Sequence, residues 1–279
     1  MQTDSKNLED EADAVMQGYL NCSLQQTDRR VLTSPFQRLG LKTAPFQRCL
    51  RDHQDHYPKT KAVSKCLPGL QRACSHSAVV VLKTIRYTMA KAMTLMARDP
   101  EVKVIHLLRD PRGTLYSRMS SAEKHIITQR AVEDYSRSYC ALIRKDLTTG
   151  DRVEGSYPDR LLRVRYEDLA LAPVRLARKL LAFVGLNLSA QQEEHIRKIT
   201  SQPTYKMNFH RVAPLKTNST AAAFAWRRAF NVSYTSLIDV SCKDVYSRAG
   251  YLPVASGEQL RDAGVPSMLA SGSVPGFLR

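Results

Sequence analysis

The stretch VKVIHLLRDPRGTLYSRMSS, residues 102–121, decides the fold of this chain. Its first seven residues are mostly apolar, as in a strand that is buried on both faces. The apolar run then ends at an arginine, an aspartate and a proline, which is where a strand gives way to a turn. We therefore predict a buried strand over 102–108, a short turn, and a helix that starts near Gly113.

Further segments of the same kind lie on either side of this stretch. The runs AVVVLKT (78–84) and RLLRVRYEDL (160–169) are predicted to be buried strands. Helices are predicted between and after them, over residues 85–100, 113–121, 123–147, 173–186, 189–200 and 232–251. Because strands alternate with helices, we predict an α/β fold whose parallel sheet is flanked by helices.

The remaining parts of the chain give weaker patterns. Residues 1–14 are acidic and polar, and we predict them to be disordered. Residues 15–254 are predicted to form one domain, in which 201–225 make a long loop. The tail 255–279 contains Gly and Ser and is predicted to be loose.

The chain is strongly basic, with 42 Lys and Arg against 26 Asp and Glu and a net charge of +16. Such a charge suits nucleic acid, an acidic glycan or a phosphorylated cofactor, or it is only a solvated basic surface. No zinc-ligand spacing, RNP-like segment or heptad pattern is present, so we predict no nucleic-acid partner. Nothing in the sequence indicates an oligomeric state.

Cysteines and glycosylation sequons favour an oxidising compartment. The six cysteines include no C-x-x-C pair, so we predict no metal site. Four of the six asparagines open N-x-[ST] sequons, which favours the secretory or Golgi lumen over coincidence. Cys66 and Cys74 either close a small disulfide loop there or are free buried thiols. The sequons begin at Asn21, Asn187, Asn218 and Asn231.

The start of the chain disagrees with this compartment. Its first 20 residues contain no apolar core of a signal peptide, and no run of 18 apolar residues occurs. Neither a signal peptide nor a membrane-spanning helix is therefore predicted. A truncated gene or a partial chain would reconcile the two observations. Membrane attachment is then expected only through an anchor that is absent from this chain.

Arg109 and Ser117 are the candidate ligands of an anion. Ligands of a parallel sheet bind outside the carboxyl ends of its strands. Arg109 follows a strand at that end, and Ser117 lies eight residues later in the next helix. A strand-to-helix turn offers backbone N–H groups, to which an arginine and a hydroxyl add bonds suited to a phosphate monoester. The alternative is that Arg109 and Asp110 only cap the helix and pair with each other.

The segment VIHLLRDPRGTLYSR (104–118) closely resembles a motif of the Golgi carbohydrate sulfotransferases that act on 6-hydroxyls of galactose, N-acetylglucosamine or N-acetylgalactosamine. In that family the motif binds the 3′-phosphate of PAPS (3′-phosphoadenosine 5′-phosphosulfate). The resemblance implies a P-loop-like sulfotransferase fold in which Arg109 and Ser117 hold this phosphate. It implies that the residues between them also line the cofactor: Asp110, Pro111, Arg112, Gly113, Thr114, Leu115 and Tyr116.

Other segments resemble the family in the same order, over about residues 60–254. These are VVLKTIRYTM (80–89), LLRVRYEDLALAP (161–173) and CKDVYSRAGYLPV (242–254). The segment KTNSTAAAFAWRRAF (216–230) resembles the late loop that folds over the nucleotide. That resemblance places five of its residues near the cofactor: Lys216, Asn218, Ser219, Trp226 and Arg227.

The resemblance implies transfer of a sulfuryl group from PAPS, without a metal, to a hydroxyl of a glycan acceptor in the Golgi. The family's first strand and its R-[ST]-G-S-S-F loop for the 5′-phosphosulfate have no counterpart here. We therefore expect an N-terminally truncated domain with doubtful activity, and the catalytic base is unassigned. The alternative is an inactive sulfotransferase-like protein that binds adenosine 3′,5′-bisphosphate or an anionic glycan.

A few polar residues near the strands have two interpretations. Tyr166 either lies along the adenosine or is an ordinary residue at the end of a strand. Glu167 and Asp168 are expected to cap the following segment, not to act as a base. His106 lies within a predicted buried strand and is expected to be a core histidine, not a catalytic one.

Overall fold

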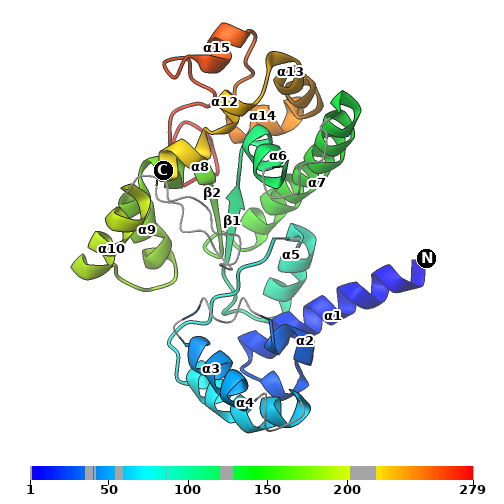
Figure 1. Cartoon of the computed structure of the whole chain (residues 1–279), viewed down its shortest axis with the longest axis vertical. Coiled ribbons are helices and arrows are strands. Elements are labelled where there is room, and N and C mark those ends of the chain that lie inside the picture. The colour runs from blue at the N-terminus through cyan, green and yellow to red at the C-terminus, as the bar shows by residue number, and fades with distance from the viewer. Residues whose placement is uncertain are drawn as a thin grey trace. The chain divides into compact units, whose positions relative to one another are not determined.

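The chain divides near residue 86 into an N-terminal unit of helices and a second unit that holds the sheet, as its computed structural model shows (Figure 1). The structure describes residues 2–34, 40, 42–53, 59–85, 87–119, 128–201 and 218–278. We predicted one domain over 15–254, whereas the structure forms two compact units, and the helices before residue 86 bury an apolar core of their own.

The N-terminal unit consists of helices that two disulfides join. Cys22 pairs with Cys74, and Cys49 pairs with Cys66. A bond between Cys66 and Cys74 is thus ruled out. Both lie on one helix, about 12 Å apart along its axis, whereas a disulfide needs Cα atoms within about 7 Å. The helices are α1 (Gln2–Leu20), η1 (Leu24–Gln26), α2 (Arg29–Leu32), α3 (Ala44–His53) and α4 (Lys59–Ser75).

Helix α1 covers residues 2–14, which we predicted to be disordered. The segment is acidic, but seven of its residues 2–14 are Glu, Ala, Leu, Lys or Gln, which have high helix propensity. Its charge suggested disorder, whereas about half of its residues favour a helix.

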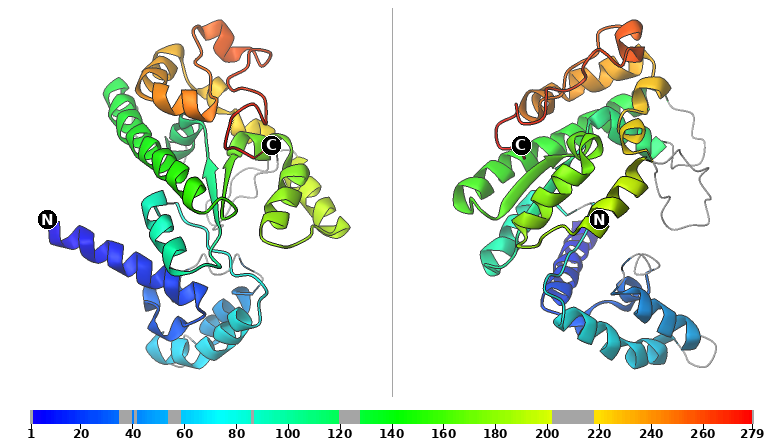
Figure 2. Two further views of the ribbon diagram at one scale, coloured as in Figure 1. Left: turned by 180° about the vertical axis from the view of Figure 1, so that it is seen from behind. Right: turned by 90° about the vertical axis from the view of Figure 1, so that its left-hand side faces the viewer.

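Two parallel strands organise the second unit, β1 (Val104–Leu108) and β2 (Leu161–Arg165). Their register pairs Val104 with Leu161 and Leu108 with Arg165, so both strands end at the same edge. Helices α5 (Met89–Arg98) and α7 (Gln129–Ser156) pack on the face that carries Val104 and Leu161. Figure 2 shows α9 (Pro173–Phe183) and α10 (Ala190–Ser201) on the other side of the strands.

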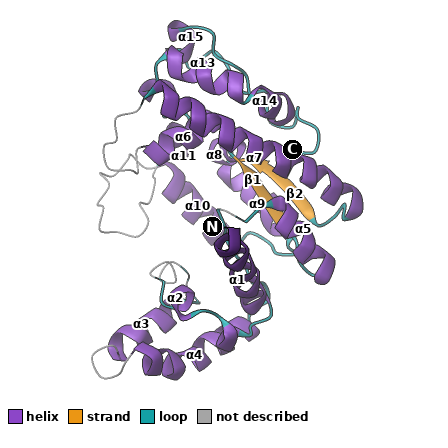
Figure 3. Cartoon of the chain, turned by 90° about the vertical axis from the view of Figure 1, so that its right-hand side faces the viewer, coloured by secondary structure: helices purple, strands orange, loops and turns teal. Residues whose placement is uncertain are grey.

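The predicted strand AVVVLKT, residues 78–84, does not form. Val81 and Ile85 are 79% and 81% exposed, and the described residues contain one sheet, of two strands, which excludes this segment (Figure 3). A buried strand needs a neighbouring strand for its backbone N–H and C=O groups. The segment has no such neighbour among the described residues, and it is grouped with the helices of the N-terminal unit.

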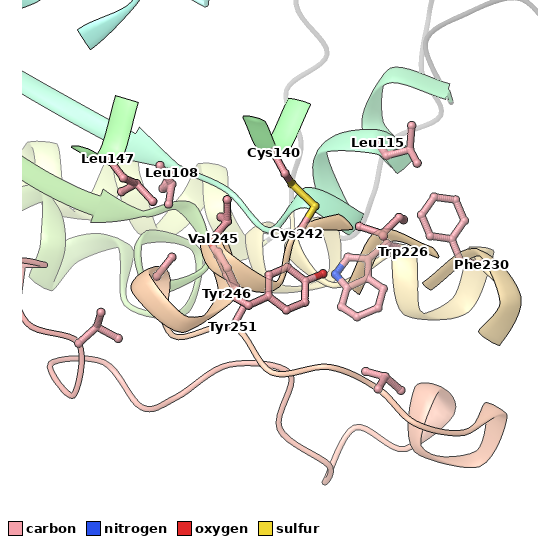
Figure 4. Packing of buried hydrophobic residues seen from close by; sticks show 14 of the residues in the cluster. Leu108, Leu115, Cys140, Leu147, Trp226, Phe230, Cys242, Val245, Tyr246 and Tyr251 are labelled. Atoms are coloured by element: carbon pink, nitrogen blue, oxygen red, sulfur yellow. A yellow bond between two sulfur atoms is a disulfide. The ribbon is translucent and has the colours of Figure 1, made fainter. Parts of the chain in front are cut away.

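The chain after residue 218 completes the main core around α6 (Pro111–Met119) and α7. The disulfide between Cys140 and Cys242 lies inside this core (Figure 4). The helices of this part are α11 (Ser219–Ala223), α12 (Trp226–Ala229), α13 (Val232–Ser241), α14 (Lys243–Ala249) and α15 (Gly257–Arg261).

The tail after residue 254 is packed, so the prediction of a loose segment is wrong. Leu260, Val274 and Phe277 from this tail are buried in the main core. These residues stand singly among Gly, Ser and polar residues. They therefore produce no periodic signal, although each one fills a place in the core.

Candidate functional site

The carboxyl ends of β1 and β2 bring Arg109 and Tyr166 together. Arg109 follows the last residue of β1, and Tyr166 follows the last residue of β2 and begins α8 (Tyr166–Leu171). The guanidinium carbon of Arg109 lies 4.5 Å from the centre of the Tyr166 ring. This is a cation–π contact, which fixes the guanidinium at the edge of the sheet.

The Arg109 guanidinium keeps hydrogen-bonding capacity for a ligand. Its Nη2 donates to the carbonyl of Ala222 at 3.3 Å, and its Nε is buried without a hydrogen-bond partner. Within the described residues it forms no ion pair with a carboxylate, because Asp110 pairs with Arg112 instead. The alternative in which Arg109 and Asp110 pair with each other is therefore excluded. A buried N–H that belongs to a cation and has no hydrogen-bond partner suits an oxyanion.

Gly113 allows the chain to come close to Arg109. A Cβ at this position would lie 3.3 Å from Arg109 Nε, 3.3 Å from Trp226 Cδ1 and 3.5 Å from the carbonyl oxygen of Ala223. The side of α6 at Gly113 thus faces Arg109. Ser117 lies one turn further along α6 on the same side, since residues four apart share a helix face. The half-buried Arg109 and Ser117 are therefore on one side of the loop.

The side chains of Asp110 and Arg112, which lie in the predicted cofactor-binding segment, pair with each other in the interior. Both are buried, with exposures of 1% and 0%. Arg112 donates to Asp110 from Nε at 3.0 Å and from Nη2 at 2.8 Å, and its Nη1 lies 3.4 Å from Asp239. Asp110 in turn accepts from the backbone N–H of Arg112 at 2.8 Å. The ion pair between these two buried side chains therefore stabilises the loop from the interior of the unit.

The other loop residues also have structural partners. Pro111 and Leu115 are buried, so within this segment they contribute side chains to the interior. The Thr114 hydroxyl donates to the Asp110 carbonyl at 3.1 Å and accepts from the Tyr139 hydroxyl at 3.4 Å. Tyr116 packs edge-on against Phe230, with ring centres 6.0 Å apart. Arg109 and Ser117 remain as the candidate side-chain ligands of this loop.

The described side chains of the late loop, residues 216–230, mostly contact other parts of the protein. Lys216 lies outside the described residues. Trp226 is fully buried, and its place near the cofactor stays a prediction. Asn218 accepts from Ala221 N–H at 2.8 Å and caps α11, and the Ser219 hydroxyl donates to the carbonyl of Ala170 at 2.7 Å. Arg227 is also buried, and it donates to backbone carbonyls of the C-terminal segment.

Glu167 is a structural residue of the site whose role the sequence did not reveal. Its carboxylate accepts from the backbone N–H of Asp110 at 3.1 Å and from the Tyr251 hydroxyl at 3.0 Å. Burial, followed by the nearby charge of Asp110, raises the pKa of Glu167 to about 7. The signal in the sequence was an acidic residue two positions after the end of a strand, in the segment RYEDL.

His106 lies in β1 and is partly buried, but its Nδ1 has no hydrogen-bond partner in the described structure, so the expectation of a core histidine holds only in part. Burial, with the charge of Arg163 as a second cause, lowers the pKa of His106 to about 4. The imidazole is therefore neutral at physiological pH, and its Nδ1 is buried.

The described residues contain neither a metal-binding cluster nor a membrane-spanning helix. They contain no group of three or more His, Cys, Asp or Glu side chains placed to hold a metal ion. None of the described helices has the length and apolar character needed to cross a membrane.

Comparison with known proteins gives a family match and several relatives. Residues 12–190 match a family model described as "Sulfotransferase family". Mouse carbohydrate sulfotransferase 5 is 27% identical over 221 residues, which cover 72% of this chain and 55% of the relative. Human carbohydrate sulfotransferase 6 is 29% identical over 224 residues, which cover 72% and 55%. The chain thus spans about half the length of these relatives. No solved structure matches it.

Proposed function

Because the chain belongs to the sulfotransferase family, we propose that it transfers a sulfuryl group from PAPS to a hydroxyl of a carbohydrate. Its relatives are carbohydrate sulfotransferases, which supports a glycan as the acceptor. PAPS supplies the sulfuryl group. The described residues contribute binding and orientation of the far end of this donor, which lowers the entropic cost of the reaction.

The environment of Arg109 is the observation that carries this proposal. The guanidinium is held over Tyr166, it is bonded to one carbonyl, and its buried Nε has no partner. A phosphate oxygen would supply the missing acceptor in a charge-assisted hydrogen bond. The Ser117 hydroxyl, on the same side of α6, would bind the same phosphate. A 3′-phosphate is the part of PAPS that fits this pair of residues.

We also propose a 6-hydroxyl of galactose, N-acetylglucosamine or N-acetylgalactosamine as the acceptor group, and the Golgi lumen as the compartment. Three disulfides support an oxidising compartment. The asparagines of all four sequons are exposed, which is compatible with a compartment in which chains are glycosylated. The choice of sugar follows only the resemblance of residues 104–118.

Titration of the full chain with adenosine 3′,5′-bisphosphate, followed by calorimetry, tests the binding part of the proposal. We expect Arg109→Ala to weaken binding by about 10- to 100-fold, since a hydrogen bond to a charged group contributes about 1.5–3 kcal/mol. Arg130→Ala is the matched control, because the Arg130 side chain is 92% exposed on α7. Equal affinity of Arg109→Ala and the wild-type chain would contradict the assignment of Arg109.

Transfer of radiolabelled sulfate from PAPS to glycans with terminal galactose or N-acetylglucosamine tests the catalytic part. We expect transfer by the wild-type chain and by Arg130→Ala, and a loss of transfer in Arg109→Ala. Binding of the bisphosphate without any transfer would reject the transferase activity of this chain. It would favour the alternative, an inactive relative that has kept the nucleotide site.

A further inference from the structure

The C-terminal strap, which we define as residues 249–270, is bound to the rest of the second unit through buried arginines. Arg165 and Arg227 are 1% and 8% exposed, and their guanidinium groups donate to backbone carbonyls along the strap. Arg165 reaches the carbonyls of Ala249, Gly250 and Leu269. Arg227 reaches those of Gln259, Leu260, Asp262 and Val265.

Arg112 connects this strap directly to the loop that presents Arg109. Its Nη1 donates to the Leu252 carbonyl at 2.9 Å, and its Nη2 donates to the Ser267 carbonyl at 3.2 Å. The same guanidinium lies 4.2 Å from the Trp226 ring and 4.9 Å from the Tyr246 ring, two of the core residues in Figure 4. The Arg112 guanidinium therefore binds three groups. These are the Asp110 carboxylate, the Leu252 carbonyl near the start of the strap and the Ser267 carbonyl near its end.

A second connection runs through Tyr251 and Glu167. The Tyr251 hydroxyl donates to Glu167, and Glu167 accepts from the backbone N–H of Asp110. The start and the end of the strap are joined next to Tyr251, where Leu252 N–H donates to the Ser267 carbonyl at 2.9 Å. The backbone of Asp110, directly after Arg109, is thus fixed by residues about 140 positions later in the chain.

We infer that the C-terminal strap is a positioning element of the donor site, and that Arg112 and Tyr251 are its positioning residues. The inference rests on the proposed function. Neither residue can touch the donor, since their exposures are 0% and 3%. If the strap carbonyls move away, N–H groups of Arg112 stay buried without acceptors. The free-energy cost of these unpaired groups favours a displaced loop. Arg109 would then leave its place over Tyr166.

Two variants and one matched control test this inference on the full chain. Tyr251→Phe keeps the buried ring and removes the hydroxyl, and Arg112→Lys keeps the charge with fewer hydrogen-bond donors. Val153→Ala removes methyl groups from a different core cluster, with Met96 and Leu161, and so lowers stability without touching the strap. Amide hydrogen exchange of residues 113–117 is measured beside the affinity for adenosine 3′,5′-bisphosphate.

In Tyr251→Phe we expect faster exchange of these amides and an affinity about three- to tenfold lower, with larger effects in Arg112→Lys. Val153→Ala is expected to change neither quantity. Unchanged exchange in both strap variants would overturn the inference. Faster exchange with an unchanged affinity would also overturn it, because the strap would then have only a structural role. A wild-type chain that fails to bind the bisphosphate would reject the proposed function, and the exchange data would still show whether the strap holds the loop.

Discussion

Glu167 is a carboxyl group held in the interior of the second unit, next to the carboxyl group of Asp110. Burial raises the pKa of Glu167 from 4.5 to about 7, and the Asp110 charge acts in the same direction. Between these two pH values the folded chain holds a proton that the unfolded chain has lost. The contribution of this group to stability is therefore complete below pH 4.5 and is lost as the pH rises through 7.

Replacing Glu167 by Gln should remove this pH dependence. The amide keeps an oxygen that accepts from Asp110 N–H and carries no charge at any pH. We expect the free energy of unfolding of Glu167→Gln, relative to wild type, to rise by up to about 3 kcal/mol between pH 4.5 and pH 8. Urea unfolding at several pH values measures it. The control is Glu194→Gln, whose side chain is 74% exposed in the wild-type chain. A constant difference between Glu167→Gln and wild type would contradict the prediction.

Individual residues of the segment RDPR show what a sequence can indicate about this site. The position of Arg109 at the end of a strand led us to predict a ligand there. In the structure Arg109 directly follows β1 and is half-buried, and its contact with a ligand stays a prediction. Arg112, three residues later, has the same side chain but is fully buried. Its partners Asp239, Leu252 and Ser267 are more than 120 residues away in the sequence, so no local pattern could reveal them.

At the scale of elements, the disulfide between Cys140 and Cys242 joins α7 to the residue that ends α13. Both cysteines are buried in the main core. A bond that closes a loop of this length, with a sequence separation of 102, restricts the unfolded chain strongly. We expect the double variant Cys140→Ala, Cys242→Ala to lose about 3–5 kcal/mol of unfolding free energy. Urea unfolding of the oxidised proteins measures this loss.

The double variant Cys49→Ala, Cys66→Ala is the control for this prediction. Its disulfide has a sequence separation of 17 and lies within the N-terminal unit. We expect it to leave amide exchange in α7 unchanged, whereas the loss of Cys140–Cys242 should accelerate it. Equal exchange in α7 of both variants would contradict a specific role of the Cys140–Cys242 bond.

Elements with local signals were predicted well, and elements that depend on partners were not. Pro173 begins α9, and Gly185, with φ of 77°, follows its end in the conformation that glycine tolerates best. By contrast, the segment 78–84 has the composition of a strand but no strand beside it. A strand exists only where another strand accepts its hydrogen bonds, and this information is absent from the segment itself.

At the scale of the whole chain, the boundary between the two units was not visible in the sequence. A linker is usually recognised by Pro, Gly and polar residues, but residues 77–88, SAVVVLKTIRYT, contain no Pro or Gly and several apolar residues. The described residues between Ser77 and Thr88 form neither helix nor strand. Each of the three disulfides lies within one unit: Cys22–Cys74 and Cys49–Cys66 in the first, Cys140–Cys242 in the second.

Limited proteolysis should separate these units. Lys83 is exposed in a segment without regular structure, so a lysine-specific protease should cut after it early. Because each disulfide joins cysteines on the same side of Lys83, fragments 1–83 and 84–279 should separate on a denaturing gel without reductant. Lys83→Gln should abolish this pair of fragments. Lys179 is the internal comparison, since it is also exposed but lies within α9, where cleavage requires local unfolding. Cleavage after Lys179 before Lys83, or fragments that separate only after reduction, would contradict the division into two units joined by residues 77–88.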